Sequence, residues 1–184
     1  MTYFLCYNTT MDFEEKTLNS EVVYRGKVIT VEKDDVELAD GTKSFREVAR
    51  HPGGVVILAM KDPMTLLLVK QFRYPIKKAV LELPAGKLEK GEDPDIAAKR
   101  ELEEETGYVA NRWISLGHIN TTPGFCDEKL YLYKAEELTY VGAHPDEGEI
   151  IKAIEITIPE VMLKIKSGEI NDAKTLCAIL RGLH

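Results

Sequence analysis

The sequence predicts a mixed α/β protein in which helices pack against a β-sheet as a sandwich. Three observations support this class. Candidate strands dominate the first half of the chain, one well-delimited helix lies near its middle between further strands, and two helical segments close it. The 184 residues are 44% hydrophobic and 30% charged, which is the composition of a chain that can bury a core.

The first 50 residues contain three strand-like segments that we expect to form an antiparallel region of their own. They are rich in β-branched and aromatic residues, and they span residues 21–24, 28–38 and 44–50. A turn at Ala39, Asp40 and Gly41 separates the last two. We therefore divide the chain into a strand region over residues 1–50 and a main domain over residues 51–184. Residues 1–10 are interpreted as a disordered extension without a function of its own.

The main domain begins with two short apolar runs, residues 55–60 and 65–71, joined by a turn at Lys61, Asp62 and Pro63. Nearly continuous apolar runs with a turn between them indicate a hairpin buried on both faces. Four further strands are predicted, over residues 78–83, 113–120, 129–136 and 150–157. Helices are predicted at the end of the chain, over residues 159–166 and 171–181.

The helix near the middle of the chain has clear start and stop signals. Asp93 is a good N-cap, Pro94 suits the first helical position, and Gly107 suits a left-handed C-cap. The helix is therefore predicted over residues 94–106.

This helix carries three carboxylates on one face, because Glu101, Glu104 and Glu105 are spaced i, i+3 and i+4. A solvated acidic face is the ordinary explanation for such a pattern. Against it, neither Glu101 nor Glu105 has a cation three or four residues away, and Lys99 and Arg100 are expected to point elsewhere. Negative charge near a helix C-terminus also opposes the helix dipole. The pattern therefore favours a cation supplied from solution.

The chemistry of that cation follows from its ligands. The predicted donors are oxygen atoms, with no His or Cys close in sequence, which favours a hard ion such as Mg²⁺ or Mn²⁺. Ala97 and Ala98, on the preceding turn, are small and are expected to leave room for the ion.

The segment from Gly86 to Tyr108 resembles the Nudix box, G-x5-E-x7-R-E-U-x-E-E-x-G-U, in which U is a bulky apolar residue. Tyr108 holds the last position, where an aliphatic residue is more usual. The matching residues are Gly86, Glu92, Arg100, Glu101, Leu102, Glu104, Glu105 and Gly107. The resemblance implies a three-layer α/β/α fold with a mixed sheet. It also implies metal-dependent hydrolysis of a nucleoside diphosphate linked to another group.

The resemblance also implies a role for each matching residue. The metal ligands would be the backbone carbonyl of Ala85 and the carboxylates of Glu101, Glu104 and Glu105. Glu92 and Arg100 would brace the loop and helix through a charge-assisted pair, and Gly86 and Gly107 would belong to the same structural bracing of the box.

Further motifs resemble the ADP-ribose pyrophosphatase branch of this family, in which the N-terminal strands form a homodimer. Pro123 stands 16 residues after Gly107, and residues 71–75, 82–86 and 122–128 are similar to motifs of that branch. The resemblance implies cleavage of ADP-ribose to AMP and ribose 5-phosphate. The implied substrate contacts are Arg46, Glu47, Arg73, Glu82 and Glu128, and Glu82 is also a candidate for the metal cluster.

Some of these roles have ordinary alternatives. Arg46 could equally be a strand-face residue, and Arg73 could stack on Phe72 or Tyr74. In the acidic loop before residue 150, Glu149 matches the branch's catalytic, metal-binding glutamate. Glu147 is the alternative in the same loop.

Charge and composition limit the partners. The formal net charge of −7 makes nucleic acid an improbable partner, and no apolar run is long enough for a membrane span. Cys6, Cys126 and Cys177 form no CxxC pair, which fits a reducing cytoplasm. The expected partner is a small nucleotide. GDP-mannose or NADH is the alternative substrate, and a non-catalytic nucleotide sensor is the alternative function, which the retained box glutamates disfavour.

Overall fold

A computed structural model describes residues 13–142 and 150–183 of the chain. These residues form two compact units that divide between Arg50 and His51. The predicted extension over residues 1–10, and the loop glutamates Glu147 and Glu149, lie outside the described residues. Within the described ranges, no helix combines the length and the apolar character needed to cross a membrane.

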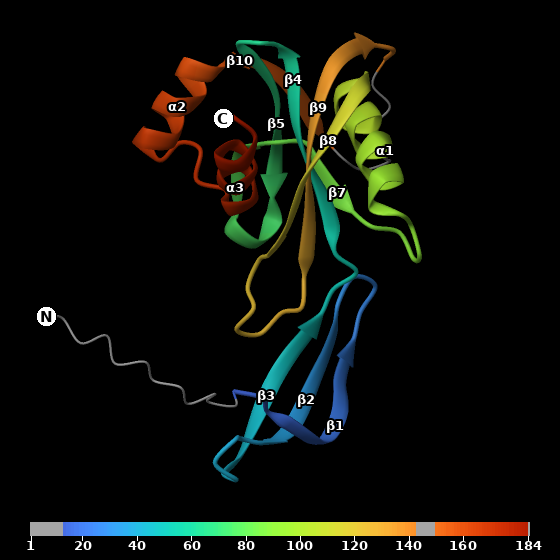
Figure 1. Cartoon of the computed structure of the whole chain (residues 1–184), viewed down its shortest axis with the longest axis vertical. Helices are drawn as coiled ribbons and strands as arrows, with labels where there is room; N and C mark the ends of the chain where they lie inside the picture. The colour runs from blue at the N-terminus through green and yellow to red at the C-terminus, as the bar shows by residue number, and fades with distance from the viewer. Residues whose placement is uncertain (1–12, 143–149, 184) are drawn as a thin grey trace, which may run out of the picture. The chain divides into compact units, whose positions relative to one another are not determined.

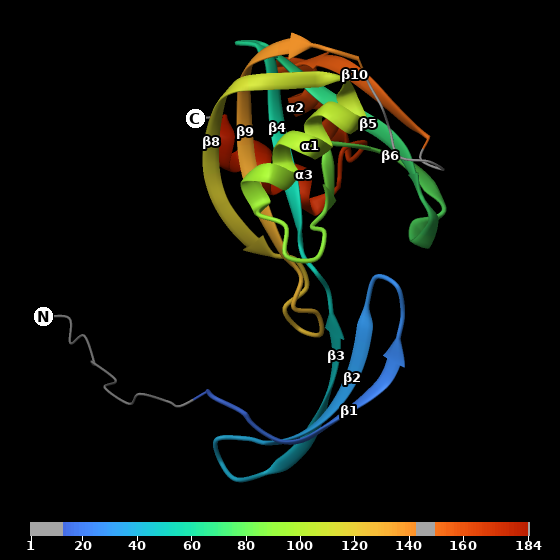
Figure 2. The ribbon, with the colours of Figure 1, turned by 90° about the vertical axis from the view of Figure 1, so that its right-hand side faces the viewer.

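The first unit is a three-stranded antiparallel sheet in the order β1-β2-β3 (Figures 1 and 2). Its strands are β1 (Lys16–Arg25), β2 (Thr30–Glu37) and β3 (Lys43–Arg50). The predicted turn joins β2 to β3, where the Asp40 side chain accepts the Thr42 N–H at 2.8 Å and Gly41 has a φ of +83°. β1 begins five residues earlier than predicted. The sequence pattern missed its first half because those residues are mostly polar and, as in the rest of the strand, all of them are exposed.

The second unit is built on a seven-stranded sheet with the main order β10-β5-β4-β9-β8, with β6 paired to β5 and β7 paired to β4. β4 and β9 are parallel and every other described pair in this sheet is antiparallel, so the sheet is mixed, as predicted. Its strands are β4 (Gly54–Asp62), β5 (Thr65–Arg73), β6 (Lys78–Glu82), β7 (Ala85–Lys87), β8 (Tyr108–Asn120), β9 (Lys129–Tyr140) and β10 (Ile151–Thr157).

The predicted hairpin is β4 and β5, at the centre of the sheet. Residues 55–60 and 66–69 are all buried, which explains why both runs are apolar without alternation. The turn between them is held by the Met64 N–H, which donates to the Asp62 carboxylate at 2.8 Å. A short 3₁₀ helix, η1 (Tyr74–Ile76), then leads from β5 to β6.

Helices cover both faces of this sheet, which makes three layers (Figures 1 and 2). α1 (Pro94–Thr106) lies on one face, and α2 (Ile158–Ser167) and α3 (Ala173–Gly182) lie on the other. Two separate apolar clusters fill the interfaces, one containing Leu102 of α1 and the other containing Val161 of α2 and Ile179 of α3. The predicted α/β/α sandwich is thereby confirmed.

α1 has the predicted bounds because its caps are encoded locally. The Asp93 side chain accepts the Asp95 N–H at 2.8 Å, and Gly107 adopts a φ of 75° while its N–H donates to the Glu103 carbonyl. The predicted role of Ala97 and Ala98 is wrong. Both are fully buried in the cluster between α1 and β4, so their small size lets the helix approach the sheet and leaves no room for an ion.

Candidate active site

The three glutamates of α1 share one edge of the helix, with different degrees of burial. Glu105 is buried at 6% exposure, and the side chain of Glu101 is 13% exposed and that of Glu104 is 28% exposed. A charge that is taken out of water must be compensated by hydrogen bonds or opposite charge. The partners of these carboxylates therefore define the site.

Arg100 supplies much of that compensation. Its Nε and Nη2 donate to the two carboxylate oxygens of Glu92 at 2.9 and 3.0 Å. Its Nη1 donates to Glu101 at 2.8 Å and to Glu104 at 2.9 Å. The hydrogen bond from Arg100 lowers the pKa of the Glu92 carboxyl below its ordinary value. The loop before α1 is thus tied to the helix by the pair of residues that the family resemblance implies.

These contacts correct one prediction. Glu101 was expected to have no cation within reach, and the structure places the Arg100 guanidinium on it. The i, i+3 and i+4 spacing rule compares positions on the helix surface, and it does not allow for the length of an arginine. The guanidinium carries five N–H donors in a planar fork, so it spans from the preceding loop to two helix carboxylates at once.

The backbone of β7 runs directly against the same carboxylates. The Ala85 N–H donates to Glu105 at 3.0 Å, and the Gly86 backbone is so close to Glu101 that an added Cβ would overlap the carboxylate. Gly86 is itself held in register opposite Val55 of the central strand β4. The sheet therefore fixes where the two carboxylates lie, and only glycine permits this approach.

A second ionic cluster surrounds Glu82, the last residue of β6, which is only 1% exposed. One carboxylate oxygen accepts from Arg73 Nε at 2.7 Å and the other accepts from Lys174. Burial alone would lower the pKa of Arg73, but the hydrogen bond and charge of Glu82, with Glu105 and Asp172 near, raise it above its ordinary value. Arg73 therefore remains charged beside the α1 carboxylates.

The start of α3 contributes to this cluster, and the sequence-based prediction missed it. Asp172 caps the helix by accepting from Thr175 N–H at 3.0 Å, and the buried Thr175 hydroxyl in turn accepts the Leu83 N–H at 2.9 Å. Lys174 lies between Glu82 and Asp172. One signal was available: a lysine in the first turn of a helix opposes the helix dipole and needs a local anion.

The remaining predicted substrate contacts lie elsewhere in their units. In the first unit, Arg46 bonds to Glu15 at 2.6 Å, and Glu47 lies opposite Lys33 on β2. In the second unit, Glu128 lies against His51, with its carboxylate 3.3 Å from the ring. The structure thus gathers Arg73, Glu82, Ala85 and the box residues, and it pairs Arg46 with Glu15 and Glu128 with His51.

Within the part of the chain that the structure describes, no group of three or more His, Cys, Asp or Glu side chains is ready to hold a metal ion. The Glu101 and Glu104 oxygens face Arg100 Nη1 instead.

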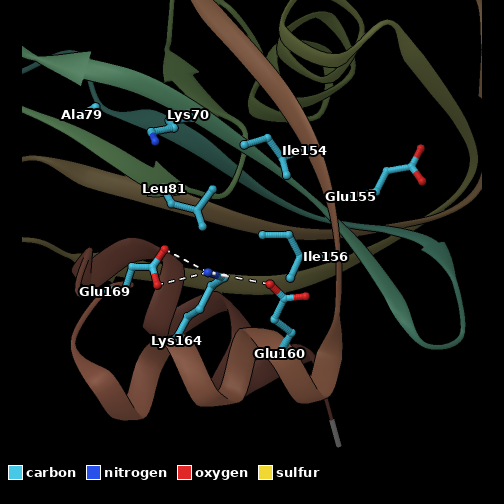
Figure 3. A pocket seen from close by; sticks show the side chains of 9 residues that line it. All are labelled: Lys70, Ala79, Leu81, Ile154, Glu155, Ile156, Glu160, Lys164 and Glu169. Atoms are coloured by element: carbon cyan, nitrogen blue, oxygen red, sulfur yellow. Dashed lines mark hydrogen bonds and ion pairs between the residues drawn. The ribbon is translucent and has the colours of Figure 1, made fainter.

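A separate hollow of about 330 Å³ lies among β5, β6, β10 and α2 (Figure 3). Lys164 of α2 lies in it between Glu169, at 2.9 Å, and Glu160, at 3.7 Å. Two carboxylates thus neutralise this cation, so the hollow offers little attraction to a phosphate.

Comparisons with known proteins identify the family of this chain. Residues 50–179 match the model of the NUDIX domain, and residues 15–49 match the nucleoside diphosphate sugar hydrolase N-terminal domain. The chain is 45% identical to the ADP-ribose pyrophosphatase of Bacillus subtilis (strain 168), covering 90% of this chain and 91% of the relative. It is 45% identical to the methanol dehydrogenase activator of Bacillus methanolicus, covering 91% of each chain. The crystal structure of an ADP compounds hydrolase superposes with a TM-score of 0.81, at 24% identity and 92% coverage of each chain.

Proposed function

This chain belongs to the Nudix family, and we propose that it hydrolyses the diphosphate bond of ADP-ribose to AMP and ribose 5-phosphate with the help of Mg²⁺. The observation that carries the proposal is the seating of the Ala85–Gly86 backbone on the buried edge of the Glu101 and Glu105 carboxylates. That arrangement presents carboxylates and a peptide group at one point of the molecule. The choice of ADP-ribose as the substrate is supported by the relative from Bacillus subtilis, which is 45% identical to this chain and is named an ADP-ribose pyrophosphatase.

The residues at this point suit a hard divalent ion. The candidate ligands are the Ala85 carbonyl and the carboxylates of Glu101, Glu104 and Glu105, which are all oxygen donors of the kind that Mg²⁺ and Mn²⁺ prefer. Because Gly86 has no side chain, the Glu101 carboxylate can occupy the space that a Cβ there would fill. When bound, the ion would neutralise phosphate oxygens and lower the pKa of the attacking water.

The chain's own residues would bind the diphosphate and manage the proton. Arg73 remains charged, and a guanidinium binds phosphate oxygens in a bidentate manner. Water attacks one phosphorus atom, the bond to the bridging oxygen breaks, and the proton of the water passes to a carboxylate. We propose Glu149 as that base, with Glu147 as the alternative, from the resemblance alone. Arg46, Glu47 and Glu128 remain proposed substrate contacts on the same basis.

The test of this proposal is hydrolysis of a substrate panel. ADP-ribose, NADH, GDP-mannose, diadenosine polyphosphates and nucleoside triphosphates are compared with Mg²⁺, with Mn²⁺ and with chelator, and phosphate is released from the products by a phosphatase. We expect metal-dependent turnover with the highest kcat/KM for ADP-ribose. A higher kcat/KM for GDP-mannose or NADH would keep the chemistry and change the substrate. Binding without any turnover would favour a nucleotide sensor.

A second candidate function is activation of a methanol dehydrogenase. One observation favours it: the relative of that name is as similar to this chain as the ADP-ribose pyrophosphatase is. The test adds the purified protein to a methanol dehydrogenase and measures its rate, with the Glu105→Gln variant as the comparison. A rise in rate that needs Glu105 would connect activation to hydrolysis, and no rise with the wild type would remove this candidate.

We also propose that the protein is a cytoplasmic homodimer in which the first unit supplies the interface. The edge strand β1 is exposed along its whole length, and it carries Leu18, Val22, Val23 and Tyr24. Exposed apolar patches of this kind favour a protein partner, and the free Cys126 and Cys177 fit a reducing compartment. Sedimentation should give a dimer, and Val23→Lys should shift it toward monomer. A wild-type monomer would contradict the proposal.

A further inference from the structure

We propose that Lys174 is a positioning residue that acts through Glu82 to aim the Arg73 guanidinium at the substrate diphosphate. The inference rests on the proposed function, because it concerns the same diphosphate. It adds to that function a residue from the far end of the chain, in the first turn of α3, that no motif of the box contains.

The positive charge of Lys174 destabilises the start of α3 and stabilises the buried carboxylate of Glu82. Asp172 is the N-cap of α3, so Lys174 is the second helical residue, where a positive charge opposes the helix dipole. Its side chain is only 14% exposed, and its ammonium contacts Glu82 as well as Asp172, which is 3.0 Å away. A lysine that served only the capping of α3 would not need to be enclosed beside a strand 92 residues earlier.

Glu82 needs two cations because it is buried. Its side chain is 1% exposed, and a carboxylate removed from water must have both oxygens satisfied. Arg73 Nε satisfies one oxygen and Lys174 Nζ satisfies the other. Each cation therefore has its own oxygen, and neither has to serve both.

This division determines the orientation of Arg73. Only its Nε donates to Glu82, and its Nη1 and Nη2 donate to no atom in residues 13–142 or 150–183. The side chain is 39% exposed, so these two nitrogens are available to an anion. Without Lys174, the second Glu82 oxygen would draw an Nη nitrogen into a bidentate pair, which is the geometry that arginine and carboxylate prefer. The Arg73 guanidinium would then turn its Nη nitrogens away from the substrate diphosphate.

A double-mutant cycle between Lys174 and Arg73 tests this. Lys174→Met keeps most of the stem of the side chain, Lys174→Arg restores the charge, and Arg73→Ala removes the group that is positioned. Lys166→Met, in the exposed last turn of α2, is the matched control. KM and kcat for ADP-ribose are measured with Mg²⁺, and the Kd for ADP is measured by calorimetry without metal.

We expect Lys174→Met to raise KM and the ADP Kd about tenfold while kcat changes less than about threefold, as for a lost binding interaction. Lys174→Arg should recover most of the affinity, and Lys166→Met should behave as the wild type. On the Arg73→Ala background, Lys174→Met should add no further loss, because both changes act through one guanidinium. Additive losses, or a lower melting temperature with KM unchanged, would overturn the positioning role.

Two further arms keep the outcome decisive. If Lys174→Met does not fold, Lys174→Gln enters the same cycle, since it removes the charge and keeps a donor; additive losses there would equally overturn the role. If the wild type binds ADP but does not hydrolyse ADP-ribose, the proposed function fails and the ADP Kd cycle still decides the role of Lys174. If the wild type hydrolyses ADP-ribose but does not bind ADP without metal, the KM cycle decides the role of Lys174 in the same way. A wild type that neither hydrolyses ADP-ribose nor binds ADP would refute both.

Discussion

Replacing Gly86 by alanine perturbs the contact on which the site depends. Gly86 is fixed in β7 by pairing with β4, opposite Val55, and an added Cβ would occupy the space of the Glu101 carboxylate. Because the strand is anchored to the centre of the sheet, the glutamate side chain must give way. We expect it to leave both the Gly86 backbone and the Arg100 nitrogen that it accepts from.

The expected size of the effect follows from this overlap. Overpacking by one methyl group at a fixed position costs about 1–3 kcal/mol. For a chain of this length, that corresponds to a fall in melting temperature of roughly 2–12 °C. Because a displacement of about 1 Å at a catalytic group costs about 100-fold in rate, kcat/KM for ADP-ribose should fall by about that factor. The Mg²⁺ concentration for half-maximal rate should also rise.

The assay compares Gly86→Ala with Gly124→Ala in thermal unfolding, and Gly86→Ala with the wild type in the rate of AMP formation. Gly124 is the matched control, because a Cβ there meets nothing within 4 Å and its φ is not in the left-handed region. Gly124→Ala should change the free energy of unfolding by less than about 0.5 kcal/mol. If Gly86→Ala has the melting temperature and kcat/KM of the wild type, the close approach of β7 to Glu101 is not a requirement of the site.

Three further predictions concern the surroundings of the site. Arg100→Met should release the loop that Glu92 anchors, and kcat/KM should fall at least about tenfold in steady-state assays while circular dichroism stays native; an unchanged kcat/KM would contradict the bracing role. Asp172 has a pKa held below its ordinary value: burial opposes this, but Lys174 and the Thr175 bonds outweigh it. The stability due to this charge is present above the unfolded pKa near 4 and is lost as pH falls through the lower folded pKa. Asp172→Asn should therefore cost about 1 kcal/mol in urea unfolding at pH 7, and this cost should shrink as the pH falls below about 4; a cost that does not change with pH would refute the charge effect. Ala98→Leu should destabilise the fold by about 1–3 kcal/mol in the same assay, because the residue is fully buried against β4. A variant as stable as the wild type would show that there is free space beside Ala98, as the sequence-based prediction of room for an ion requires.

The parts of the fold that the sequence predicted are those encoded locally. The caps of α1 are the side chain of Asp93 and the left-handed Gly107, so both ends of the helix were readable from single residues. The buried hairpin was readable from its unbroken apolar runs. By contrast, β7 has three residues, which is too short for any periodicity to show, and it exists because β4 offers it hydrogen-bond partners.

The parts of the site that the sequence did not predict depend on contacts between distant segments. Lys174 and Glu82 meet across 92 residues, and Thr175 reaches Leu83 across the same separation. No spacing rule connects such positions before the sheet brings α3 to the end of β6. The Arg100–Glu101 contact was missed for a different reason, because it depends on the rotamer of a long side chain at an adjacent helical position.

The most direct test of the central claim is the rate of AMP formation from ADP-ribose by the wild type and by Glu105→Gln, each with Mg²⁺ and with chelator. The carboxamide oxygen of Gln can still accept the Ala85 N–H, so the fold should survive while the charge is lost. We expect chelator to abolish the wild-type rate and the variant to lose at least about 100-fold with Mg²⁺ present. A wild-type rate that persists in chelator, or a Glu105→Gln variant with full turnover, would contradict the account.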